Sequence, residues 1–289
     1  MKFEKSYKLT MSPTAKYNVF IIGAGGTGGY LIPNIAKIKA LGVDNAKVSN
    51  FTLTVIDGDS VESKNCKRQM FFDVDIGRNK AEVMSERYSE IYGTEIGFVD
   101  QYVESVEQLE DIVCGLDNGY FNVIVGCVDN HKSRQVIHEF YKKTINTFWL
   151  DSGNEETSGQ VICGVNYGHN VFNKGRIALK NVLQLHHDTM IGGPRFELPC
   201  VTDMFPSILE NKETKFNSEM SCAERAEVSP QNIFVNTMAA QLLMLYLRKI
   251  ITNDGLKSFC TTFSIDSINT RTLFNSFTNI DKIIKEVHG

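Results

Sequence analysis

Residues suited to binding and using a nucleotide occur in a fixed order within the first 130 positions of this 289-residue chain. A glycine-rich turn comes first, followed by an acid, an amide, a guanidinium, an ammonium and a second acid with its amide neighbour. These residues are Gly23, Gly25, Gly26 and Gly28, then Asp57, Asn65, Arg68, Lys80, Asp129 and Asn130. Glycines that lead into a helix leave backbone N–H groups free for a phosphate. The charged residues after the turn indicate chemistry on a triphosphate.

The individual residues differ in how well they separate the possible nucleotides. Asp57 follows the apolar run Phe51–Ile56 and could accept hydrogen bonds from the ribose of either NAD or ATP. Arg68 and Lys80 favour ATP, because a dehydrogenase does not need them and a departing pyrophosphate does. Asp129 follows the apolar strand Val123–Val128, where it could hold Mg²⁺ against phosphate oxygens, cap the next helix, or do both.

Strand-like and helix-like segments alternate along most of the chain, which predicts an α/β fold with a Rossmann-like doubly wound sheet. Its N-terminal half should be parallel, and its C-terminal half mixed or antiparallel. The expected strands are Asn18–Ile22, Phe51–Ile56, Asn122–Val128, Thr147–Leu150 and Gln160–Val165, with a closing strand or hairpin in Phe259–Asn269. The expected helices are Thr27–Leu41, Arg78–Tyr92, His131–Tyr141 and Asn232–Ile251. Ligands of such sheets bind at the carboxyl ends of the strands, so the glycine turn, Asp57 and Asp129 should share one crevice.

The chain is expected to form one domain. Residues 1–17 should be a short, partly disordered arm, and residues 18–289 a single nucleotide-binding domain. Residues 168–223 have weak periodicity and many Gly, Pro, Asn and charged residues, which is typical of an irregular functional loop or a disordered one.

Composition excludes several classes of protein. The net charge of −4 gives no electrostatic signature of nucleic-acid binding, and no apolar run approaches the roughly 20 residues that span a bilayer. The N-terminus does not resemble a signal peptide. Seven single cysteines without a C-x-x-C pair argue against a disulfide framework and a structural zinc site. We therefore expect a soluble cytoplasmic protein without zinc.

The glycine turn, the stretch from Asp57 to Gln69, the pair Gly77 and Lys80, and the segment Cys127–Asn130 together resemble the ThiF/MoeB superfamily. This superfamily contains the ubiquitin-activating enzymes and their bacterial relatives. The later segments 151–154, 158–161 and 221–231 resemble more narrowly the ThiF-like proteins of bacterial PRTRC gene clusters. The resemblance covers about residues 18 to 248.

The resemblance implies a Mg·ATP site in which Asp57 binds the ribose, Asn65, Arg68 and Lys80 contact phosphates, and Asp129 holds the metal. The glycines and Asn130 would also lie against the nucleotide. The implied reaction is attack of a substrate carboxylate on the α-phosphate, which gives an acyl adenylate and pyrophosphate. The implied substrate is a small ubiquitin-like or sulfur-carrier protein that ends in glycine, and the implied assembly is a homodimer.

The sequence departs from the superfamily pattern ahead of the glycine turn. Many bacterial members carry an Arg there that reaches the partner subunit's ATP, whereas residues 1–22 contain none. Lys5, Lys8 or Lys16 could substitute, or the contact between subunits could be missing.

A thioester step would need a cysteine near the adenylate. Pro199 and Cys200 precede Phe205 and Pro206 at a spacing similar to the nucleophile loop of eukaryotic ubiquitin-activating enzymes. Cys200 is therefore the candidate nucleophile and Cys222 a weaker one, with inert packing as the alternative. The pair His186–His187 could assist, although paired loop histidines are usually solvated. The single Trp149 is expected in the core.

Two other functions remain open from the sequence. A scaffold could bind the nucleotide without performing chemistry, although it could dispense with some of Asn65, Arg68, Lys80 and Asp129. An NAD-dependent oxidoreductase would explain the glycine turn and Asp57 but none of those four residues, and it would bind NAD(H) without magnesium.

Overall fold

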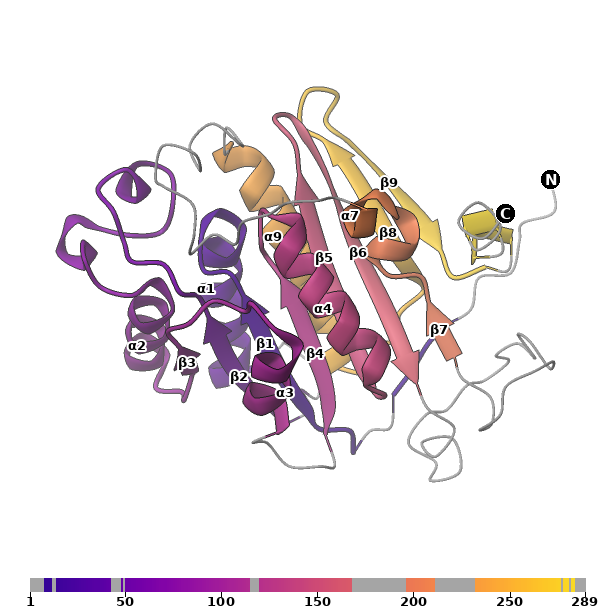
Figure 1. Cartoon of the computed structure of the whole chain (residues 1–289), viewed down its shortest axis with the longest axis horizontal. Coiled ribbons are helices and arrows are strands. Elements are labelled where there is room, and N and C mark those ends of the chain that lie inside the picture. The colour runs from indigo at the N-terminus through magenta and orange to yellow at the C-terminus, as the bar shows by residue number, and fades with distance from the viewer. Residues whose placement is uncertain are drawn as a thin grey trace.

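The computed structural model describes residues 8–11, 14–42, 48, 50–114, 120–167, 196–210, 232–276, 278–280 and 282–283. Nine strands in these residues form one sheet, and helices cover both of its faces (Figure 1). Helix α1 packs against α2 and α9 on one face, while α4 packs against α3 and α7 on the other. The predicted α/β class is confirmed.

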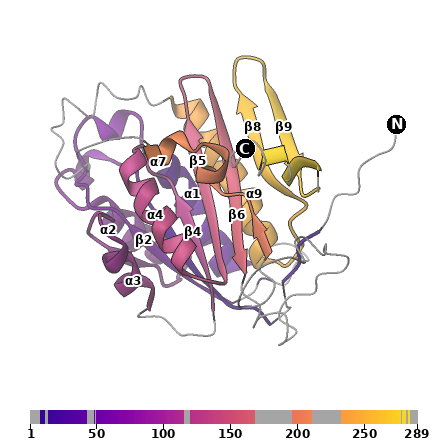
Figure 2. The same cartoon turned by 45° about the vertical axis from the view of Figure 1, so that its right-hand side comes forward.

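The strand order is β3-β2-β1-β4-β5-β6-β8-β9, and the short β7 pairs with β6 outside this path. The five strands from β3 to β5 are parallel, and every pairing from β5 onward is antiparallel, as the sequence predicted. The hairpin of β8 and β9 forms one edge of the sheet (Figure 2). The strands are β1 Tyr17–Ile22, β2 Phe51–Ile56, β3 Gly97–Val99, β4 Phe121–Gly126, β5 Thr147–Asn154, β6 Ser158–Tyr167, β7 Phe196–Leu198, β8 Ser258–Ser264 and β9 Asn269–Phe274.

The helices begin where the sequence supplies a cap. Asn79, Asn130 and Asn232 are the N-caps of α2, α4 and α9, and each side chain accepts a hydrogen bond from a backbone N–H of the first turn. The helices are α1 Gly26–Leu41, α2 Lys80–Tyr92, α3 Val106–Cys114, α4 His131–Lys143, α6 Val201–Met204, α7 Ser207–Glu210 and α9 Ile233–Ile251, with 3₁₀ turns at Asn65–Lys67 and Asp73–Asp75.

The core lies between the central strands and the helices on either face. All six residues of β1 are buried, because a central parallel strand is covered on both sides. Trp149 on β5 is 1% exposed and contacts the rings of His138 and Tyr141, so its predicted place in the core is confirmed.

Residues 8–11 are an ordered part of the expected N-terminal arm. Leu9 and Leu256 exchange two backbone hydrogen bonds, each of 2.8 Å, and both side chains are buried. Met11 is also buried. This part of the arm belongs to the core because its apolar side chains close the end of the sheet beside residue 256.

Several elements were not predicted. Strand β5 continues to Asn154, so Asp151 lies within the strand and not after it. Strands β3 and β7 have three residues each and helices α6 and α7 four each, which is too short for a periodic pattern. Helix α3 was missed as well.

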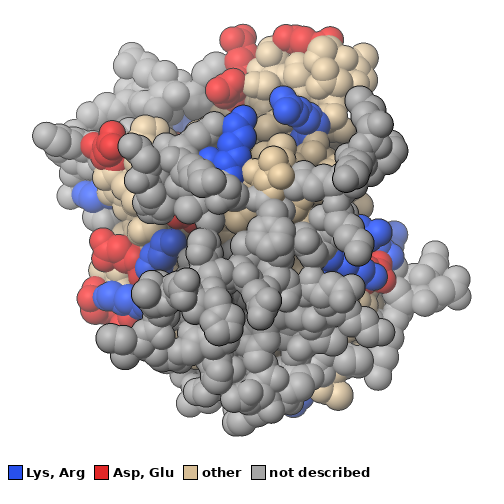
Figure 3. Space-filling model, turned by 90° about the vertical axis from the view of Figure 1, so that its right-hand side faces the viewer, with Lys and Arg blue, Asp and Glu red and all other residues tan. Residues whose placement is uncertain are grey.

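None of the described helices combines the length and apolar character needed to cross a membrane. On the face that carries the β9 edge, the acidic and basic side chains of described residues are interspersed (Figure 3).

The glycine turn between β1 and α1 depends on two very close backbone contacts. Gly23 has φ of +97°, and a Cβ atom there would lie 2.6 Å from the carbonyl oxygen of Cys127. A Cβ at Gly28 would overlap the carbonyl oxygen of Gly23. These two glycines therefore allow the helix to start directly against the ends of β1 and β4.

We predict that Gly28→Ala lowers the free energy of unfolding by about 1–3 kcal/mol or prevents folding, because the added methyl group displaces the turn. The neighbouring Gly29→Ala is the control, since its Cβ would lie 3.5 Å or more from other atoms. That variant should keep or slightly raise stability, because alanine favours a helix. Urea unfolding followed by Trp149 fluorescence measures both. Equal stability of the two variants would contradict this account of the turn.

Candidate functional site

A cavity of about 560 Å³ opens at the carboxyl ends of the parallel strands, where the chain leaves β1 in one direction and β4 in the other. This is the place at which doubly wound sheets bind ligands. Its lining includes Gly23, Gly25, Gly26, Thr27, Asp57, Asp59, Gln69, Lys80, Tyr102, Asp129, Asn130, His131, Arg134, Asp151, Asn154, Val201, Phe205, Asn232 and Asn236. The predicted meeting of the glycine turn, Asp57 and Asp129 in one crevice is observed, and Lys80 lines the same cavity.

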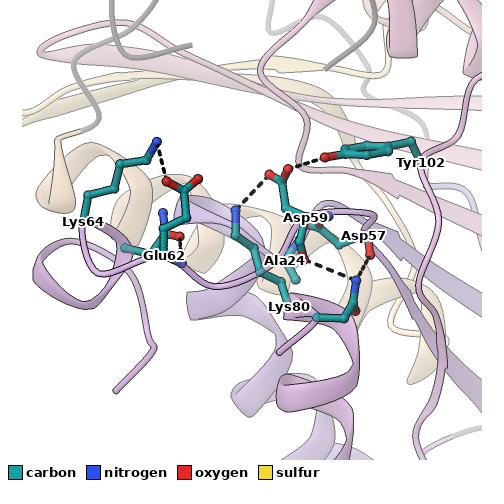
Figure 4. A network of polar contacts seen from close by, with 9 residues as sticks. Ala24, Asp57, Asp59, Glu62, Lys64, Lys80 and Tyr102 are labelled. Atoms are coloured by element: carbon teal, nitrogen blue, oxygen red, sulfur yellow. Dashed lines mark hydrogen bonds and ion pairs between the residues drawn. The ribbon is translucent and has the colours of Figure 1, made fainter. Parts of the chain in front are cut away.

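One wall of the cavity is a network of charged side chains in which Lys80 is buried and Asp57 and Asp59 are half-buried (Figure 4). Asp57 accepts hydrogen bonds from the backbone N–H groups of Ala24, at 2.6 Å, and Asp59, at 2.8 Å. The Lys80 ammonium lies 2.9 Å from Oδ2 of Asp59, and the Tyr102 hydroxyl donates to Oδ1 of the same carboxylate. Asp57 thus holds the glycine turn, and Asp59 holds the cation.

The network keeps Lys80 charged although the residue is only 6% exposed. Burial lowers the pKa of Lys80, but Asp57, Asp59 and Asp129 outweigh it, so the pKa is raised above its usual value. Burial also raises the pKa of Asp57, and Lys80 opposes that rise. The site therefore offers a cation to an anionic ligand.

Asp129 and Asn130 have different roles in the structure. Asn130 Oδ1 accepts a hydrogen bond of 2.7 Å from the N–H of Ser133, so its side chain caps α4. The alternative role considered for Asp129, capping the helix, thus belongs to its neighbour. Asp129 is exposed at the cavity wall, and its charge reaches Lys80. A carboxylate beside a phosphate site is the kind of ligand that Mg²⁺ uses, so the residues present fit this metal.

Arg134 is a cavity residue that the sequence analysis missed. Its Nε donates to Asp151 at 3.0 Å, and its Nη2 donates to the carbonyl oxygens of Val128, at 2.8 Å, and Ser152, at 2.9 Å. Burial raises the pKa of Asp151 to about 6, and Arg134 opposes that rise. The guanidinium thereby fixes the segment that carries Asp129. The sequence does contain a signal for Arg134, because a basic residue occupies a position on the buried side of α4.

Two of the predicted phosphate ligands lie outside the cavity lining. Asn65 is buried, and its Oδ1 accepts a hydrogen bond of 2.7 Å from the N–H of Glu62, so it stabilises the local turn. Arg68 is half-buried, and its Nε is buried without a hydrogen-bond partner among the described residues. An unsatisfied guanidinium N–H beside Gln69, which does line the cavity, is compatible with a ligand that carries a phosphate.

Cys200 is enclosed in the described conformation. The residue is 0% exposed, and its Sγ lies 3.0 Å from Thr202 Oγ1 and 3.0 Å from Asp203 Oδ2. Burial, with Asp203 adding to it, raises the pKa of the thiol to about 12. Thr202 in turn lies 2.7 Å from Nδ1 of His138 on α4. This geometry is that of a packed cysteine, and a nucleophilic role for it stays a prediction.

Other predicted residues lie away from the cavity or outside the described residues. Lys16 precedes β1 at the amino ends of the parallel strands, whereas the cavity lies at their carboxyl ends. Its Nζ lies 5.2 Å from the centre of the Tyr120 ring, and Lys8 packs beside Gly255. Lys5, His186, His187 and Cys222 fall outside the described residues, as do positions 168–195 and 211–223 of the irregular region.

A model of the ThiF family matches residues 8–282. The fold is similar to that of PaaA (17% identity, TM-score 0.54), of E. coli MccB with ATP (17%, 0.54) and of E. coli MccB with AMPCPP and MccA (16%, 0.53). Each comparison covers 90% of this chain and 64% of the other, so the chain spans less than two thirds of their length. No curated protein matches the sequence significantly.

We predict that iodoacetamide at pH 8 leaves Cys200 unmodified in the folded protein. With a pKa of about 12, about one thiol in ten thousand is ionised at that pH, against roughly a quarter for an unperturbed thiol. Mass spectrometry of peptides, with the urea-unfolded protein as control, measures the modification. Rapid labelling of Cys200 in the folded protein would show that the segment around it opens and would support a nucleophilic role for Cys200.

Proposed function

Because this chain belongs to the ThiF family, we propose that it activates a substrate carboxylate by ATP-dependent adenylation. The observation that carries the proposal is the meeting of the buried Lys80 cation, the exposed Asp129 carboxylate and the N-terminus of α1 around one cavity. An oxidoreductase would need only the turn and Asp57. The similar fold of E. coli MccB, whose structure with ATP is known, supports the same nucleotide here.

The proposed roles follow the positions of the residues. Gly25 and Gly26 lie at the N-terminus of α1 and line the cavity. The free backbone N–H groups in the first turn of a helix suit phosphate oxygens. Asp57 retains acceptor capacity for ribose hydroxyls beyond its two backbone hydrogen bonds. In this proposal Lys80 would face the β- and γ-phosphates, and Arg68, whose Nε lacks a partner among the described residues, would also contact them.

In the proposed reaction, a substrate carboxylate oxygen attacks the α-phosphorus of ATP and the bond to the bridging oxygen of pyrophosphate breaks. The products are the acyl adenylate and pyrophosphate, whose charge grows as it leaves. Lys80 stabilises that charge without reorganisation, because Asp59 already holds the ammonium in place. Mg²⁺ bound by Asp129 would offset phosphate charge.

The substrate we propose is a small ubiquitin-like or sulfur-carrier protein with a C-terminal glycine. E. coli MccB, which has a similar fold, has a structure with both AMPCPP and MccA. A protein of this fold can thus hold a partner besides the nucleotide, which supports a polypeptide substrate here. A homodimer is also proposed, as is later transfer to Cys200, which would require the segment around α6 to move. A scaffold that binds ATP without turnover is the alternative.

We predict that the wild type binds ATP more tightly with Mg²⁺ than without it, and that Asp129→Asn loses most of this difference, about tenfold in Kd. Isothermal calorimetry measures the effect, and Asp111→Asn on the exposed surface of α3 is the matched control. An unchanged Mg²⁺ dependence in Asp129→Asn would remove the metal from this residue. Preferential binding of NAD⁺ or NADH by the wild type would overturn the ATP assignment.

We predict that Lys80→Gln slows adenylation by about 100-fold while ATP affinity falls much less, because the charge on pyrophosphate grows in the transition state. ATP–pyrophosphate exchange with a Gly-tailed carrier protein measures turnover, calorimetry measures affinity, and circular dichroism checks the fold. Lys64→Gln is the control, since Lys64 pairs with Glu62 at the surface. Equal losses in turnover and affinity would make Lys80 a binding residue only.

A further inference from the structure

The cavity wall also carries neutral polar side chains to which the proposed adenylation assigns no role. There the start of α1, the end of β5 and the first turn of α9 meet through Thr27, Asn154 and Asn236, which we call the amide cluster. Nδ2 of Asn154 donates to Thr27 Oγ1, at 2.8 Å, and to Asn236 Oδ1, at 2.9 Å. All three residues line the cavity. The cluster joins three elements that lie far apart in the sequence.

Two atoms of the amide cluster lack a hydrogen-bond partner within the described part of the chain. They are Oδ1 of Asn154 and Nδ2 of Asn236, and both are buried, with Asn236 as a whole 4% exposed. The result does not depend on which atom of each amide is oxygen. Exchanging oxygen and nitrogen in both side chains again leaves one donor and one acceptor unpaired.

A buried donor and acceptor without partners cost about 1–3 kcal/mol each, so a ligand that satisfies both gains that energy on binding. The χ2 angle of asparagine has a broad distribution of allowed values, so both amides can turn toward a ligand. The carboxylates near the cluster do not attract an anionic ligand group. Asp151 is paired with Arg134, and Glu155, which accepts a hydrogen bond of 2.7 Å from Ser158, keeps its negative charge at the surface. The ligand group at the amide cluster should therefore carry no negative charge and should offer one donor and one acceptor.

We propose that Asn154 and Asn236 bind the backbone of one residue in an extended peptide tail of the substrate. The N–H and C=O of a single residue in a strand point to the same side, so they can pair with two neighbouring partners. The N–H would donate to Asn154, and the C=O would accept from Asn236. The tail's carboxylate would then extend toward Asp129 and the nucleotide. This inference rests on the proposed function and defines its substrate class as peptides with a free backbone N–H near the carboxyl terminus.

The position of the cluster explains why the tail would lie here. Asn154 ends β5, and the carbonyl of Ser152, two residues earlier, is held by Arg134, which also fixes the segment that leads to Asp129. The amide cluster and the metal-binding carboxylate are thus attached to one rigid unit. A small carboxylic acid without an amide would reach the nucleotide and leave the two asparagines unsatisfied, so it should be a poor substrate.

The test uses the full chain saturated with AMPCPP and Mg²⁺, and two tripeptide probes. One probe is Leu-Gly-Gly, and the other carries N-methylglycine in place of both glycines, so that neither can donate a backbone N–H. Calorimetry should show weak binding of Leu-Gly-Gly and at least about tenfold weaker binding of the methylated probe. Equal affinities, or no binding of Leu-Gly-Gly at ~20 mM, would overturn the proposal.

Variants separate the amide cluster from the nucleotide site. Asn236→Leu and Asn154→Leu should each weaken Leu-Gly-Gly binding by about tenfold and change AMPCPP affinity much less, because neither side chain has a proposed contact with the nucleotide. Gln241→Leu, on the exposed side of α9, is the matched control and should bind both ligands like the wild type. Asn236→Ser replaces Asn236→Leu if the latter does not fold. Unchanged peptide affinity in the cluster variants would overturn the proposal.

The outcomes for the two proposals can be distinguished. If AMPCPP itself does not bind, the nucleotide assignment fails, and the same peptide titration on the unloaded protein still decides the role of the cluster. If AMPCPP binds and the two probes do not differ, adenylation stands and the peptide-binding role of Asn154 and Asn236 is wrong.

Discussion

The buried contact between Lys80 and Asp59 is the interaction on which the rest of the site depends. An ammonium that is 6% exposed is tolerable only with carboxylate partners, and loss of either partner would leave an uncompensated charge. The same segment fixes the backbone around it. Asp57 binds the N–H of Ala24, while the Asn79 side chain donates to the carbonyl oxygens of Asp57, at 2.8 Å, and Asp59, at 3.2 Å. One set of contacts therefore joins the glycine turn, the end of β2 and the start of α2.

This arrangement means that contacts within the chain hold the glycine turn and the Lys80 cation in place. The glycine turn is held from both sides, by Asp57 and by the close approach of Gly23 to Cys127, and the cation is held by Asp59. Groups fixed in this way need no reorganisation when charge develops, which is the condition under which electrostatic stabilisation is large. Arg68 differs, because its Nε is buried without a hydrogen-bond partner among the described residues.

The sequence predicted the features that depend on local pattern and missed those that depend on distant contacts. The long strands and helices, the parallel half and the convergence of Asp57 and Asp129 follow from apolar runs and their ends. The role of Asn65 in a turn, the enclosure of Cys200 by Thr202 and Asp203, and the pairing of Asn154 with Asn236 do not. The last pair is separated by 82 positions, and no periodicity connects them.

Charge sets a limit on how the second substrate can be bound. The described cations that line the cavity are Lys80 and Arg134, and each is already paired with a carboxylate. ATP and a substrate carboxylate are both anions, and Asp57, Asp59 and Asp129 add negative charge nearby. In the proposed complex Lys80, Arg68 and Mg²⁺ would face the phosphates of ATP, so attraction between opposite charges would contribute little to the affinity for a carboxylate nucleophile. Neutral hydrogen bonds to the part of the substrate that precedes the carboxylate can supply it, and the unsatisfied donor and acceptor of Asn236 and Asn154 belong to residues that line the same cavity, which is the reason for proposing that this part binds there.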